Sequence, residues 1–160
     1  MNALKILNRG HQNLLDVIKD LPSQAWTDGF VTGSWTVRDV VDHIAIYEEM
    51  QVEAFEKFIN PNALTPLHDE KAQGTFLEFN AQQSEKDKDK TGSEVFKRYT
   101  DGFTKLEQIV KNFSAEQMVN PEATIWYGDK CSFDDVIAYN FGHKKHHLAQ
   151  IKLFRQRNKV

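Results

Sequence analysis

The sequence is poor in cysteine, because Cys131 is the only one among its 160 residues. A single cysteine cannot form an internal disulfide, so we expect a fold held by its core and a reducing, cytoplasmic compartment. Long apolar runs are also missing: no stretch approaches the roughly 20 residues that cross a bilayer, and the N-terminal segment is amphipathic, unlike a secretion signal. We therefore expect no membrane partner.

An excess of positive charge is missing too. The 20 lysines and arginines stand against 23 acidic residues, which gives a net charge of −3, and no basic cluster alternates with aromatic residues. Binding to a phosphate backbone requires such a positive surface, so nucleic acid is not an expected partner. The one charged run, residues 85–90, has the pattern of a solvated face or a bend. A chain of this length can bury a full core, and we expect a single domain over residues 1–160.

Apolar residues recur at helical spacing in four long segments, and no segment alternates as a strand would. The first helix is expected from about Leu4 to Leu21, where Pro22 ends it. Thr36 is a candidate N-cap with Asp39 at the third helical position, so the second helix should run from Val37 to about Ile59. The remaining two segments follow a long connection over residues 60–74, which contains two prolines.

The third helix is expected to begin near Phe76, to bend at the charged run and to continue to Phe113. The fourth is expected to begin after Ser132, a second candidate N-cap, with Asp135 at the third helical position. It should end in the basic tail Arg155–Lys159, which suits the negative end of a helix dipole. The fold class predicted is therefore all-α, a four-helix bundle with a long crossover connection between helices two and three.

Three histidines can meet in such a bundle. His143 and His147 lie about 40° apart on one face of the fourth helix, one turn from each other. His43 lies on a face of the second helix that should turn inward, so it can supply a third imidazole to a divalent ion. A satisfied core histidine at 43 and a wet basic stretch at 144–146 would give the same pattern, and the residues alone leave both interpretations open.

Other residues are candidates for the surroundings of this site. Tyr47 lies one turn beyond His43, and Asn140 lies three residues before His143, so both are predicted to lie near the ion or a substrate. They can equally satisfy each other or the backbone. His11 is either a fourth ligand or a core histidine, and His68 is expected to be exposed.

Trp35 and Trp126 precede the second and fourth helices at equivalent places. They either plug the end of the bundle or flank the mouth of a pocket with flat apolar walls. Both interpretations place the two indoles near the capped ends of helices, and the sequence does not decide between them.

Two motifs resemble a known family. The segment from His143 to Ile151, with histidines at i and i+4 followed by Gln150, resembles the last-helix signature of the DinB/YfiT-like superfamily. The segment from Gly33 to His43 is similar to its second-helix motif. The resemblance implies a four-helix bundle that holds zinc or nickel on His43, His143 and His147. Phe79 and Asn80, with the linker before Thr91, also resemble the ClbS/DfsB branch, which does not usually carry the paired C-terminal histidines.

The resemblance also suggests what such a site does. Some members of the superfamily are metal-dependent transferases that use a low-molecular-weight thiol, including a maleylpyruvate isomerase branch. We therefore predict a metal-dependent thiol transferase or hydrolase that acts on a small-molecule substrate. The alternatives are a non-catalytic module that binds metal or a small molecule in stress protection, and an ion that only ties two helices together. A homodimer is also expected, because exposed helix faces pair readily.

Overall fold

The computed structural model describes residues 2–121, 125 and 130–160. Its four long helices are α1 (Ala3–Ile18), α2 (Val37–Ile59), α5 (Gly92–Lys111) and α7 (Phe133–Asn158). The shorter elements are η1 (Ser23–Trp26), α3 (Pro66–Lys71), α4 (Phe76–Lys86) and α6 (Ala115–Val119). Within the described ranges the only β pairing is an isolated bridge between Thr32 and Trp35. The all-α prediction is confirmed.

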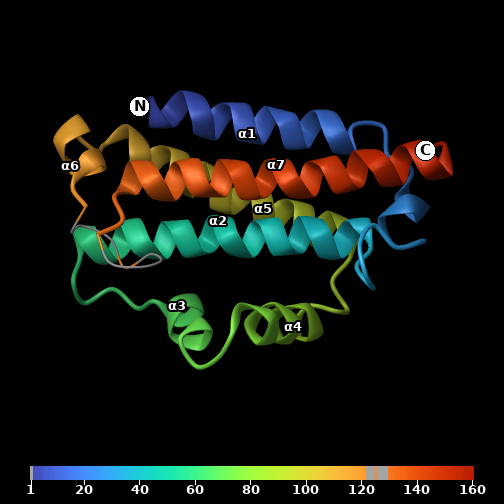
Figure 1. Ribbon diagram of the computed structural model, residues 1–160, viewed down its shortest axis with the longest axis horizontal. Coiled ribbons are helices and arrows are strands. Elements are labelled where there is room, and N and C mark those ends of the chain that lie inside the picture. The colour runs from blue at the N-terminus through green and yellow to red at the C-terminus, as the bar shows by residue number, and fades with distance from the viewer. Residues whose placement is uncertain (1, 122–124, 126–129) are drawn as a thin grey trace.

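The four long helices close around one core. α1 contacts α7 and α5, and α2 contacts the same two helices from the other side. Figure 1 shows α1 and α7 running in one direction and α2 and α5 in the other. Because α2 and α5 are parallel, the chain between them has to return along the bundle, and α3 and α4 lie on this return, outside α2 (Figure 1).

Capping boxes fix where the two histidine-bearing helices begin. The hydroxyl of Thr36 accepts from the backbone N–H of Asp39, whose carboxylate accepts from the N–H of Thr36 at 2.8 Å. Ser132 and Asp135 make the same exchange at the start of α7. Each cap stabilises its helix by roughly 1 kcal/mol, and together they confirm both predicted helix starts.

The third predicted helix is in fact two helices, so that prediction was wrong. α4 ends at Lys86, and a new capping box of Thr91 and Glu94 begins α5. A local N-cap offers the backbone N–H groups a partner that a continuous helix would not need. The bend expected at the charged run is therefore a complete break.

One residue of the charged run is buried. Asp87 is only 8% exposed, and its carboxylate lies 2.6 Å from both the Arg98 guanidinium and the Lys90 ammonium. Its backbone carbonyl accepts from the buried guanidinium of Arg38. Two arginines thus tie Asp87 to α2 and α5. The exposed residues of the run, Glu85, Lys86, Lys88 and Asp89, agree with the predicted solvated face.

The core takes its apolar side chains from all four long helices. Fully buried members include Leu14, Val40, Phe55, Leu106 and Ile151. Burying each such side chain contributes roughly 1.5–3 kcal/mol relative to leaving it in water. Among the described residues, no helix combines the length and the apolar character needed to cross a membrane.

Candidate metal centre

The structure brings the three predicted histidines together between α2 and α7. Nε2 of His43 lies 2.9 Å from Nε2 of His143, and Nε2 of His147 lies 3.0 Å from the same atom. One ligand atom from each histidine lies within 4.8 Å of the others. Three imidazole nitrogens from two helices therefore point at one small region, and this group can hold a metal ion.

The positions follow from local structure. His143 and His147 are four residues apart in the middle of α7, so their rings lie on one side of that helix with centroids 4.7 Å apart. His43 is in the second turn of α2, where the capped start of the helix fixes its height along the bundle. The antiparallel packing of α2 on α7 then sets the His43 ring 4.9 Å from His143 and 4.8 Å from His147.

Burial keeps these imidazoles neutral. Desolvation, together with the smaller effects of the neighbouring His143 and His147, lowers the pKa of His43 to about 2. Desolvation, followed by His147 and other nearby positive charges, lowers the pKa of His143 to about 3. The pKa of His147 is also lowered, chiefly by burial. A neutral imidazole has a free lone pair on one nitrogen, which is the form that binds metal.

The donor set fits a divalent transition metal. Three neutral rings carry one N–H each, so three mutually facing Nε2 atoms cannot all be matched as donor and acceptor, whereas a cation accepts all three lone pairs. Tetrahedral zinc with nitrogen at 2.0–2.1 Å separates its ligand atoms by roughly 3.4 Å. The two shortest separations, 2.9 and 3.0 Å, are slightly below that value. Imidazole suits zinc and nickel.

Gln150 orients one of the rings. Nδ1 of His147 donates to Oε1 of Gln150 at 2.8 Å, which places the ring proton on Nδ1 and leaves Nε2 free to bind an ion. The amide nitrogen of Gln150 in turn donates to Thr32 Oγ1 at 3.4 Å. Gln150 belongs to the last-helix motif, and its position three residues after His147 is a sequence signal for this contact.

Aromatic side chains surround the imidazoles. The Trp35 ring lies 4.9 Å from the ring of His43 and 6.4 Å from that of His147, centroid to centroid. The Tyr47 ring lies 4.8 Å from His43, and its hydroxyl donates to Asn80 of α4 at 3.4 Å. Of the two interpretations of Trp35, the structure favours a wall beside the site. Trp126, its expected counterpart, lies outside the described residues.

Asn140 has its described contacts within α7 and beside the core. It is 4% exposed, and its amide nitrogen donates to the carbonyl of Val136 at 3.1 Å. Three residues along a helix correspond to a rotation of about 60° from His143, and that rotation turns Asn140 toward a small cavity beside Glu48. The prediction that places it next to the ion therefore has no described contact to support it.

Two other histidines also lie elsewhere. His11 bonds through Nδ1 to the hydroxyl of Tyr99 at 3.1 Å and stacks on Phe103 at 3.8 Å between centroids, so it is a core residue of the bundle. The side chain of His68 is 12% exposed and bonds to Glu53 at 2.9 Å. The expectation that His68 is exposed was wrong, because Glu53 holds the start of α3 onto α2.

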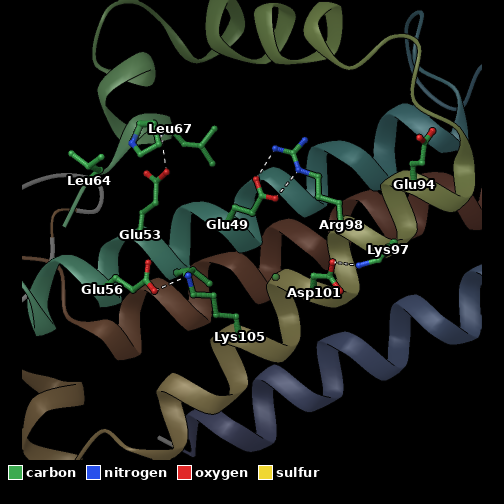
Figure 2. A pocket seen from close by; sticks show the side chains of 13 residues that line it. Glu49, Glu53, Glu56, Leu64, Leu67, Glu94, Lys97, Arg98, Asp101 and Lys105 are labelled. Atoms are coloured by element: carbon green, nitrogen blue, oxygen red, sulfur yellow. Dashed lines mark hydrogen bonds and ion pairs between the residues drawn. The ribbon is translucent and has the colours of Figure 1, made fainter.

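A wide groove on another face of α2 is a separate feature. It has a volume of about 760 Å³, runs between α2 and α5 below the start of α3, and is lined by none of the three histidines. Figure 2 shows its charged side chains joined in pairs, Arg98 with Glu49, Lys105 with Glu56 and Lys97 with Asp101. All three basic groups of the groove are already paired and offer little to an anionic ligand, and we assign no function to this groove.

Comparison with known proteins gives one family match. The family model of the DinB superfamily matches residues 6–151, which include both histidine-bearing helices and the connection between them. No curated protein and no solved structure gives a significant match. The likeness to the ClbS/DfsB branch stays a prediction. On the strength of this match, which covers most of its length, the chain belongs to the DinB superfamily.

Proposed function

We propose that the protein binds one divalent metal ion, zinc or nickel, on His43, His143 and His147, and that this centre serves a metal-dependent transfer of a low-molecular-weight thiol to a small molecule. The observation that carries the proposal is the approach of three imidazole nitrogens, one from each histidine, to within 4.8 Å of one another. Three protein ligands is also the number found in catalytic zinc sites, which keep a further position for water or substrate.

Bound there, the ion would supply positive charge that lowers the pKa of a thiol or water held beside it. Three neighbouring side chains would orient a ligand, shield the site and contact the reactant. Gln150 fixes the His147 ring through Nδ1, and Trp35 shields the rings of His43 and His147 on one side. The phenol of Tyr47, which lies beside both His43 and His143, is placed to hold a hydrogen bond to a reacting group.

Thiol transfer fits these neighbours better than hydrolysis does. The described side chains in ring contact or hydrogen bonded with the three imidazoles are aromatic, amide or histidine, and none is a carboxylate. The three carboxylates nearest His43 in sequence have partners elsewhere: Asp42 pairs with Arg98, Glu48 pairs with Lys144, and Asp39 accepts from the N–H of Thr36. Metalloproteases use a carboxylate as general base for the attacking water. A thiol has an ordinary pKa of about 8.5, far below that of water, and ionises beside a cation without such a base.

The same observation supports a second candidate, a non-catalytic module that captures a small molecule at the metal. Such a module needs an ion and aromatic walls but no general base. A ligand that raises the melting temperature only of the metal-loaded protein, and leaves it without chemical change, would indicate capture.

Elemental analysis and a turnover screen test the proposal together. The purified protein should carry close to one equivalent of zinc or nickel, and His43→Ala should lose it while keeping the helical circular dichroism. Lys145→Ala is the matched control, because this exposed residue of α7 is not in the triad. Thiols are then screened with electrophiles. Metal-dependent turnover supports transfer, whereas stoichiometric metal without turnover supports capture, and absence of metal contradicts both.

A further inference from the structure

A buried ion pair lies in the core close to the three histidines. Glu48 of α2 is 1% exposed and Lys144 of α7 is 5% exposed, and their charged groups are in direct contact. The ammonium of Lys144 also donates to the hydroxyl of Tyr99 on α5 at 3.3 Å, and that hydroxyl contacts His11 of α1. One polar side chain from each long helix therefore takes part in this cluster.

Each member of the pair directly follows a residue that contributes to a contact at the metal centre. Tyr47 precedes Glu48 on α2, His143 precedes Lys144 on α7, and the rings of Tyr47 and His143 are 4.5 Å apart. α2 and α7 are antiparallel (Figure 1), and both contacts form at one axial position of α7 relative to α2. An axial shift of α7 that separates Lys144 from Glu48 therefore also displaces His143.

Stability alone is a weak explanation for this pair. The free energy of moving two charges out of water offsets much of their mutual attraction. Proteins in which apolar side chains replace a buried ion pair are often equally stable. The surrounding atoms are not fully satisfied either: Oε2 of Glu48, Oε1 of Gln51 and Oδ1 of Asn140 have no hydrogen-bond partner among the described residues. Buried polar groups without partners are unfavourable.

Alignment is what a buried ion pair provides and an apolar contact does not. Apolar side chains can repack after a shift of one helical turn, about 5.4 Å, whereas a shifted pair leaves two uncompensated buried charges. A metal centre requires its ligand distances to hold within about 0.2 Å. We propose that Glu48 and Lys144 are positioning residues, which fix α7 on α2 so that His143 and His147 reach His43. This inference rests on the proposed metal function.

The test replaces the pair with apolar side chains of similar size in Glu48→Leu/Lys144→Met. The matched control is Glu56→Leu/Lys105→Met, which removes the 2.7 Å ion pair between α2 and α5 in the groove of Figure 2. Crystal structures of the metal-free proteins give the separations of the three Nε2 atoms, and competition with a chromophoric chelator gives the zinc affinity. Thermal unfolding is measured alongside, so that loss of fold is recognised.

We expect the apolar variant to fold, with its Nε2 atoms further apart than 2.9 and 3.0 Å and with zinc binding about 10–100-fold weaker. The groove variant should keep both properties. Converged imidazoles or unchanged zinc affinity in Glu48→Leu/Lys144→Met would overturn the inference.

Two further outcomes have their own criteria. If the apolar variant does not fold, Glu48→Gln/Lys144→Met is scored by the same criteria, because it keeps the shape and removes the charges. If the unmodified protein binds no zinc, the proposed function fails, and the metal-free separations alone decide whether the pair aligns the helices.

Discussion

The ring of Tyr47 lies 4.5 Å from the ring of His143, centroid to centroid, although the two residues come from different helices. This contact places a phenol beside a group of neutral imidazoles, within a fold that otherwise surrounds them with Trp35 and the solvent-facing ring of Tyr139. A phenol next to a cation site can donate a hydrogen bond to a reacting group. Removing its hydroxyl therefore distinguishes a role in turnover from a role in metal binding.

Tyr47→Phe should keep the metal and lose activity. The ring remains as a wall, and only the hydroxyl that donates to Asn80 at 3.4 Å is removed. If that hydroxyl serves the reacting group, kcat with the thiol identified in the screen should fall about 100-fold, with zinc affinity unchanged. An unchanged kcat would limit Tyr47 to a packing role.

Gln150→Ala should weaken zinc binding about 10-fold, because the His147 ring would lose the acceptor that fixes its Nδ1 proton. Chelator competition measures the effect. Lys152→Ala, an exposed change on the same helix, is the control and should bind zinc as the unmodified protein does. Equal affinities for the two variants would contradict the orienting role of Gln150.

Zinc should raise the melting temperature, and a chelator should reverse the change. A ligand that binds only the folded state at 100 times its Kd adds about 2.7 kcal/mol, which for a chain of this size corresponds to roughly 5–10 °C. The shift should vanish in His143→Ala and persist in Lys145→Ala, an exposed change on the same helix. A zinc-dependent shift in both variants would place the ion elsewhere.

Acid should destabilise the metal-free protein from about pH 6.5 downward. The folded-state pKa values of His43 and His143 are about 2 and about 3, below the ordinary value of 6.5, so the unfolded chain takes up protons first as the pH falls. Their contribution to stability is complete above pH 6.5 and is lost between that pH and the folded-state values.

Each of these two groups adds a slope of at most about 1.4 kcal/mol per pH unit. Urea unfolding at pH 7.5, 6 and 5 measures the loss, and His43→Ala/His143→Ala should show a flatter dependence. Parallel pH profiles for the variant and the unmodified protein would show that the two imidazoles are not the cause.

The parts of this structure that the sequence predicts are those set by local chemistry. Thr36 and Ser132 mark the starts of α2 and α7 because N-caps act within three residues. His143 and His147 share a face because helical geometry requires it. The inward face of α2 then made His43 the natural third member.

The remainder depends on contacts distant in sequence. Lys144 belonged to an apparently wet basic stretch, and only its contact with Glu48 on another helix shows why it is buried. Asp87 lay within a charged run and is buried because Arg38 and Arg98 reach it from α2 and α5. Asn140 is rotated by about 60° around the helix from His143. That rotation is the difference between facing the core and facing the site, and helical periodicity alone does not distinguish the two.

The most direct measurement is a crystal structure of the zinc-loaded protein with anomalous diffraction recorded at the zinc edge. The account predicts one anomalous peak about 2.0–2.1 Å from Nε2 of each of His43, His143 and His147. A peak at another place, or three rings with no ion between them at saturating zinc, would contradict it.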